Sequence, residues 1–199
     1  MKQRPDLTGL EGIALQQGGY FDRQDAQTHG LGDRLLHYHV GTGRFERCFP
    51  GVFRLSRAPL APHDDLLLAQ VWTNYRGVIS HHNALALYTL SDVMPHRVHL
   101  TVPLDFRRTT SPFVLHRSTL PPDDVTDYDG VRATTPARSI VDAASSGIGP
   151  EQIVKAVRQG LERALFDVVR LRAVAHRARY RNRRTTVPLI EDALRHATT

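Results

Sequence analysis

The 199-residue sequence predicts an α+β protein with a small N-terminal domain, followed by a mixed α+β domain with a helical C-terminal part. Three observations support this prediction. Short helical patterns precede one aromatic hairpin pattern in residues 1–57, strand-like and helical segments mix in residues 64–149, and residues 150–199 have mainly helical spacing. Hydrophobic residues make up 41% of the chain, which is enough to form a core.

Helix-breaking residues divide the N-terminal domain into short elements. A helix is expected within residues 10–19, where apolar residues have helical spacing before a glycine pair. Asp22 is expected to cap a second helix that Gly30 closes. A third helix should begin near Gly32 or Asp33 and end between residues 41 and 43, with an apolar side.

An alternating aromatic segment follows the third helix. In residues 44–56, apolar and polar side chains alternate on both sides of a turn at Pro50 and Gly51, which predicts a β-hairpin. Two helices, a turn, a third helix and a hairpin occur in the order of a winged helix-turn-helix. A helix fits the major groove of DNA and a β-ribbon reaches the neighbouring phosphates, so this order indicates DNA binding.

The domain boundaries follow from composition. Residues 1–57 are predicted to form the winged helix-turn-helix, and the prolines of residues 58–63 indicate a linker. Residues 64–199 are predicted to form the α+β domain. Within it, strands are expected at 96–103 and 113–120, an Asp-Gly turn at Asp129, and a helix capped by Thr135 with Pro136 in its first position.

Charge and cysteine content limit the function classes. The net charge of +6 and the pI near 10.0 indicate an anionic partner. Cys48 is the only cysteine, which excludes an internal disulfide and a cysteine-based zinc cluster. The chain shows no signal-peptide core and no apolar run of membrane-spanning length, so we expect a cytoplasmic protein without a membrane partner.

The predicted DNA-binding residues are polar or basic side chains of the helices and the hairpin. Arginine pairs with guanine or phosphate, and histidine and tyrosine can donate to phosphates. The helical candidates are Arg23, Gln24, Arg34, His37, Tyr38, His39 and Thr42. The hairpin candidates are Arg44, Arg47 and Arg54. The alternatives are a solvated surface and a winged helix that binds only protein.

A second basic stretch, residues 176–184, has two interpretations that the sequence leaves open. It is either a second nucleic-acid contact or the solvated, positively charged end of a helix. Its candidate residues are Arg177, Arg179, Arg181, Arg183 and Arg184.

No catalytic residue, metal site or cofactor is expected. Among the histidines of the second domain, His81 and His82 are adjacent, and His96 and His99 would point to opposite faces of a strand. No carboxylate spacing around these histidines, His116 included, completes a zinc motif such as H-E-x-x-H, so these side chains are expected to be solvated or hydrogen-bonded. Asp127 and Asp129 are explained by a turn.

The alternative function is a small metal-dependent nuclease with an N-terminal DNA-binding domain. Such an enzyme needs clustered carboxylates near a lysine. Lys155 has no acidic residue two positions before it, and Lys2 is terminal, which argues against this alternative.

The chain resembles the AbiEi family of bacterial antitoxins. Residues 12–56 resemble the family's N-terminal winged helix, and residues 77–103 and 129–144 resemble its second domain. The resemblance implies a non-enzymatic regulator that binds repeats in its own promoter and represses transcription. It also implies an antitoxin domain at residues 64–199 and a cognate nucleotidyltransferase-like toxin, counteracted directly or indirectly.

Overall fold

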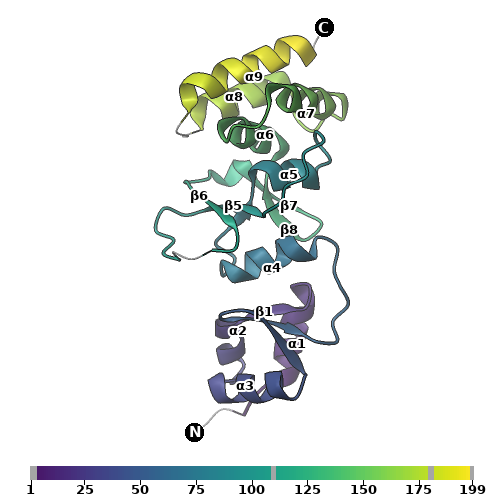
Figure 1. Ribbon diagram of the computed structural model, residues 1–199, viewed down its shortest axis with the longest axis vertical. Coiled ribbons are helices and arrows are strands. Elements are labelled where there is room, and N and C mark those ends of the chain that lie inside the picture. The colour runs from purple at the N-terminus through teal and green to yellow at the C-terminus, as the bar shows by residue number, and fades with distance from the viewer. Residues whose placement is uncertain (1–3, 109–110, 179–181, 198–199) are drawn as a thin grey trace. The chain divides into compact units, whose positions relative to one another are not determined.

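The computed structural model describes residues 4–108, 111–178 and 182–197, except for the side chain of Arg183. Contacts within the chain divide it into two compact units, Met1–Arg76 and Gly77–Thr199 (Figure 1). The predicted α+β class is confirmed, with a helical C-terminal part. No helix among the described residues is long and apolar enough to span a membrane.

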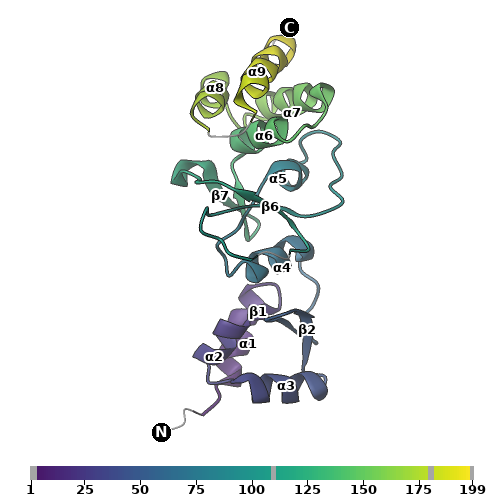
Figure 2. The same cartoon turned by 60° about the vertical axis from the view of Figure 1, so that its left-hand side comes forward.

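The first unit contains the predicted helices and hairpin, together with one more helix. Its elements are α1 (Leu7–Gln16), β1 (Tyr20–Asp22), α2 (Arg23–Thr28), α3 (Asp33–Gly41), β2 (Phe45–Phe49), β3 (Val52–Leu55) and α4 (Asp64–Trp72). The sheet has the order β1-β3-β2, and both pairings are antiparallel. This is the arrangement of a winged helix, with α3 as the second helix of the helix-turn-helix and β2–β3 as the wing (Figure 2).

Local sequence signals explain how α2 begins and ends. The Asp22 carboxylate accepts from the Asp25 backbone N–H at 2.8 Å, and the Asp25 carboxylate accepts from the Asp22 N–H at 2.9 Å. This reciprocal capping box satisfies two N–H groups that the helix itself leaves free. Gly30 has a φ of +77°, which turns the chain toward α3. The predicted cap and stop are confirmed.

Aromatic side chains join the wing to the helices. The Phe21 ring meets Phe45 edge-on at 4.9 Å between centroids and stacks on Phe53 at 5.6 Å. Leu10 of α1 and Leu36 of α3 are buried in the same cluster. Burial of these side chains supplies the main stabilisation of the unit, at about 1.5–3 kcal/mol for each large side chain.

The first unit extends past the predicted linker. The Tyr20 hydroxyl donates to the Asp64 carboxylate at 2.6 Å, which ties the start of α4 to β1. The Arg54 guanidinium donates to the carbonyls of Ala58 at 2.7 Å and Pro59 at 3.0 Å. Residues 58–63 are therefore attached to the winged helix, and α4 joins it. The contacts divide the chain after Arg76, whereas composition placed the boundary at 57–64.

The second unit has a five-stranded sheet and five α-helices among its described residues. Its elements are β4 (Val78–Ile79), α5 (His81–Leu87), β5 (His99–Val102), β6 (Val114–Arg117), the 3-10 turn η1 (Pro122–Asp124), β7 (Val125–Tyr128), β8 (Val131–Thr134), α6 (Pro136–Ser145), α7 (Pro150–Glu162), α8 (Val168–Arg177) and α9 (Arg183–Ala197). The strand order is β6-β5-β4-β8-β7, with β5–β6 and β4–β8 parallel. Helices α6–α9 form one group, which contacts α5 through α6 (Figures 1 and 2).

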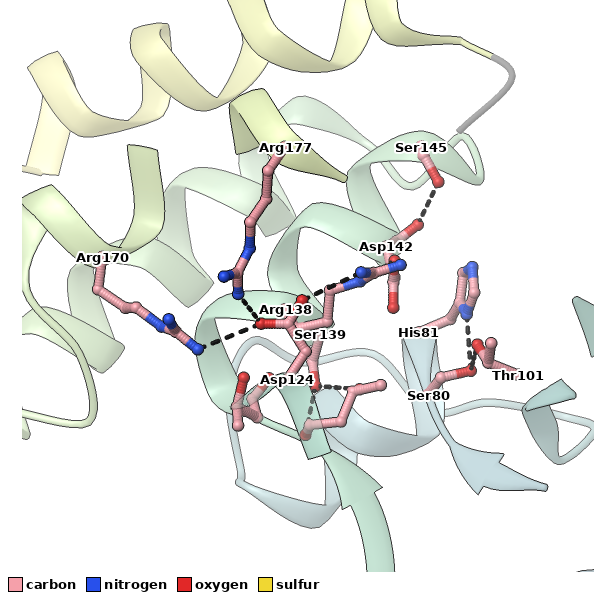
Figure 3. Close-up of polar contacts among 12 residues, drawn as sticks. Ser80, His81, Thr101, Asp124, Arg138, Ser139, Asp142, Ser145, Arg170 and Arg177 are labelled. Carbon is pink, nitrogen blue, oxygen red and sulfur yellow. Dashed lines mark hydrogen bonds and ion pairs between the residues drawn. The ribbon is translucent and has the colours of Figure 1, made fainter. Parts of the chain in front are cut away.

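A buried ion network attaches the helices to the turn before β7. Asp124 is fully buried, and its carboxylate accepts from Arg138 of α6 and Arg170 of α8, each at 3.2 Å, and from Arg177 of α8 (Figure 3). Arg138 is also buried and donates to Asp142 at 2.8 Å. One carboxylate thus connects three elements that are distant in sequence.

The pH dependence of stability should reveal the state of Asp142. Burial raises the pKa of Asp142 to about 6, with Arg138 opposing the shift, and its Oδ2 has no hydrogen-bond partner. Because the pKa in the folded state exceeds that of the unfolded chain, this group stabilises the fold at low pH and loses that contribution as pH rises through 6. When the pH is lowered from 7 to 5, the free energy of unfolding of the wild type should increase by about 1 kcal/mol relative to that of Asp142→Asn.

Urea unfolding at both pH values measures this difference. Other groups that titrate in this range are present in both proteins, so their effects largely cancel in the comparison. An equal change in both proteins would contradict a raised pKa at Asp142.

Candidate nucleic-acid interface

Helix α3 presents one polar face to solvent. His37 and Tyr38 lie three and four residues after Arg34, and Gly41 follows one turn later; all four are exposed, and Tyr38 is 61% exposed. Leu36 is buried in the core on the opposite side of the helix. An exposed aromatic side chain beside an arginine, on a helix held by apolar contacts, is suited to contact a groove or a phosphate backbone.

The wing stands beside this face. Arg47 is exposed on β2, and the Arg23 backbone N–H donates to the Gly51 carbonyl at 2.9 Å, which holds the hairpin turn against the start of α2. Helix α3 and the wing border a groove of about 490 Å³. Its lining residues are Arg23, Asp33, Leu36, His37, Val40, Arg47, Gly51 and Phe53.

The exposed arginines of this unit differ in their partners. Arg23 pairs with Asp33, and Arg44 pairs with Glu11 at 2.7 Å, with all four side chains at least a third exposed. Exposed pairs of this kind contribute only about 0–1 kcal/mol, so a phosphate can replace the carboxylate. Arg34 and Arg47 have no ion pair with any described residue. These two arginines are the unpaired cations of the surface formed by α3 and the wing.

Two predicted contacts are less accessible than expected: Arg54 is buried and His39 is only partly exposed. Arg54 is 8% exposed and donates to the carbonyls of Ala58 and Pro59, and its guanidinium lies 5.7 Å from the Tyr20 ring centre. The prediction that it binds the DNA backbone is corrected: Arg54 fastens the segment after β3. The His39 ring packs 5.1 Å from Phe45, and burial and the nearby Arg44 lower its pKa, so it remains neutral and faces the hairpin.

Two further predicted residues lie at the edges of the candidate surface. Gln24 is exposed on α2. Thr42 is exposed at the end of α3, where its hydroxyl donates to the His39 carbonyl at 3.3 Å. Both side chains are accessible from solvent.

The second basic stretch is not a uniform positive surface. Arg177 is engaged by Asp124, so its charge serves the fold of the second unit. Arg184 is exposed, whereas Arg179, Arg181 and the side chain of Arg183 lie outside the described residues. Of the predicted set, only Arg184 is described as exposed and without an ion pair.

The residues considered for magnesium binding or nuclease chemistry make other contacts. The Asp127 carboxylate accepts from the Gly130 N–H at 3.1 Å within the turn between β7 and β8. Lys155 pairs with Asp92 at the surface. Among the described residues, the group of three side chains arranged to hold a metal ion consists of histidines, His81, His99 and His116. Sequence reasoning missed this cluster because its members come from three separate elements.

Comparison with known families gives a match within the first unit. Residues 13–56 match the family described as transcriptional regulator, AbiEi antitoxin, a span that runs from α1 through the wing. This segment is similar to the AbiEi antitoxin family. The predicted resemblance is confirmed here, and the AbiEi-type domain includes α3, the wing and the groove between them. The match ends at Ser56, before the second unit begins.

One solved structure supports the fold of the whole chain. The RV2827C protein from Mycobacterium tuberculosis matches with a TM-score of 0.65 at 14% sequence identity, over 98% of this chain and 78% of that one. At this identity the match establishes the shared fold alone. No curated protein matches the chain significantly.

Proposed function

We propose that this protein is a non-enzymatic antitoxin that represses its own operon by binding the promoter with its AbiEi-type domain. The family match of residues 13–56 supports the broader role of antitoxin and transcriptional regulator. The single observation that supports DNA binding by this surface is the pair of unpaired arginines, Arg34 on α3 and Arg47 on the wing.

The proposed docking follows from the geometry of the two elements. Helix α3 enters the major groove, where Arg34, His37 and Tyr38 contact base edges or phosphates. The wing follows the adjacent backbone, and Arg47 neutralises a phosphate. Arg23 and Arg44 exchange their carboxylate partners for phosphates on binding. The order of elements in the AbiEi-type domain thus assigns specificity to α3 and positioning to the wing.

Antitoxin activity is assigned to the second unit. The resemblance in residues 77–103 and 129–144 supports this assignment, with a nucleotidyltransferase-like toxin as the cognate partner, counteracted directly or indirectly. When a nucleotidyltransferase-like toxin encoded beside this gene is expressed, co-expression of the full chain should restore growth, and absence of rescue would contradict the assignment.

Binding to the upstream region tests the DNA-binding proposal. Fluorescence anisotropy with the duplex upstream of the gene should show tighter binding than with a scrambled duplex of equal length. The logarithm of the binding constant should fall linearly with the logarithm of salt, with a slope of about −0.9 for each phosphate neutralised. A flat salt dependence would favour a protein-docking module, and magnesium-dependent cleavage of the duplex would favour the nuclease alternative.

A further inference from the structure

Three histidines from three elements of the second unit meet on one face of the sheet. His81 begins α5, His99 begins β5, and His116 lies in β6. Strands β5 and β6 are parallel, and Thr101 pairs with His116. Because alternate residues of a strand share a face, His99, Thr101 and His116 lie on the same side of the sheet. One ring nitrogen from each of the three histidines lies within 4.8 Å of those of the other two.

The rings contact one another directly. The His116 Nε2 atom lies 3.2 Å from His99 Nδ1, and the His81 and His116 rings stack at 3.5 Å between centroids. Each neutral imidazole has one nitrogen with a free lone pair. The cluster therefore contains more acceptor nitrogens than its own hydrogen bonds use. His82 also lies nearby, but its Nε2 contacts the Ser146 hydroxyl at 3.2 Å.

Buried hydroxyl groups fix the orientation of His81. The Ser80 hydroxyl lies 2.8 Å from His81 Nδ1 and accepts from the Thr101 hydroxyl at 2.9 Å (Figure 3). A serine oxygen has two lone pairs, so it can accept from Thr101 and from His81 Nδ1–H together. That tautomer leaves His81 Nε2 unprotonated. A buried partner on the other nitrogen is the usual support for a metal-binding histidine.

The protonation state of the cluster suits a metal ion. Burial, together with neighbouring imidazoles, lowers the pKa of His99 and of His116 to about 4 and that of His81 well below its usual value. All three rings are therefore neutral at pH 7, and neutral imidazole is the form that ligates metals. His81 is buried, whereas His99 and His116 are partly exposed, so an ion can reach the cluster from solvent.

We propose that His81, His99 and His116 form a binding site for a divalent transition-metal ion, with zinc as the expected occupant. Three nitrogens around tetrahedral zinc lie about 3.4 Å apart, given Zn–N bonds of about 2.1 Å. Because the lone pair of an imidazole lies in the plane of its ring, the partly exposed His116 ring has to turn out of its parallel stack with His81 when the ion binds. Imidazole ligands select zinc and its neighbours over magnesium or calcium, which prefer oxygen. The fourth position remains for water or an anion.

Metal titration of the tag-free full chain tests the site. Calorimetry with Zn²⁺, and visible absorption with Co²⁺ as a spectroscopic probe, should report a single ion per chain in tetrahedral coordination. Elemental analysis after dialysis should find the same stoichiometry. Zinc should also raise the melting temperature, because it binds only the folded cluster.

Conservative variants assign the ligands. His99→Gln and His116→Gln should each weaken zinc binding by about 100-fold or more, and Ser80→Ala by about 10- to 100-fold through loss of orientation. His96→Gln is the matched control, since His96 is exposed and outside the cluster. Circular dichroism verifies that each variant folds. Absence of binding in wild type, or unchanged binding in both ligand variants, would overturn the site.

Discussion

Replacing Arg34 and Arg47 together with alanine should weaken binding to the promoter duplex by at least about 30-fold, at about 1–3 kcal/mol for each arginine. Both side chains are exposed, and neither has an ion-pair partner among the described residues, so both charges are available to DNA. The single variants should separate their roles. Arg34→Ala should reduce discrimination between promoter and scrambled duplex, whereas Arg47→Ala should weaken binding to both and reduce the salt slope by about 1.

A control with the same loss of charge makes this test specific. The double variant Arg107→Ala and Arg158→Ala removes two exposed arginines of the second unit. Its promoter affinity should stay within about twofold of wild type, because the loss of net charge by itself has only a small general effect on binding. The circular dichroism of all variants should match wild type, because these side chains lie at the surface. If both double variants bind equally well, α3 and the wing do not form the interface.

Replacing Asp124 with asparagine should destabilise the second unit by about 3–5 kcal/mol. Asp124 is fully buried and receives hydrogen bonds from Arg138, Arg170 and Arg177, and Arg138 is itself buried. Removal of the carboxylate leaves buried positive charge with only Asp142 to balance it. Such a loss has a larger cost than the loss of an exposed pair, because water cannot replace the missing partner.

The neighbouring residue provides the matched control. Asp123 is exposed, and Arg170 contacts its backbone carbonyl, which Asp123→Asn retains. Urea unfolding followed by far-ultraviolet circular dichroism should show a loss of stability for Asp124→Asn and a change within about 0.5 kcal/mol for Asp123→Asn. The only tryptophan, Trp72, lies in α4 of the first unit, so its fluorescence should report a nearly unchanged transition. Equal stability of the two variants would contradict the structural role of the network.

The features of the candidate interface that could be predicted from the sequence depend on residues close together in the chain. The Asp22 capping box, the stop at Gly30 and the Pro50–Gly51 turn each involve residues only a few positions apart, and the structure confirms all three. Helical periodicity identified α3 and the residues on its outer face. The assignment of Arg34 and Arg47 to an exposed surface could therefore be made from the sequence.

The roles of other charged residues could not be predicted in this way. The alternation of side chains along the strand predicts that Arg54 is exposed on the wing. Its guanidinium instead donates to the carbonyls of Ala58 and Pro59. Arg177 lies in a basic stretch that predicted a surface, but Asp124 holds it. In both cases the partner is a particular group that only the folded chain brings near, and arginine has a side chain long enough to reach it.

The sequence by itself determined the α+β class, the order of the winged-helix elements and the outward face of α3, because caps, turns and periodicity act over a few residues. Only the tertiary structure decided that α4 joins the first unit, that Asp124 gathers three arginines, and that His81, His99 and His116 meet. Each of these depends on which strands pair and which helices pack on them. Contacts between residues distant in the chain result from burial of the whole core, which no local pattern encodes.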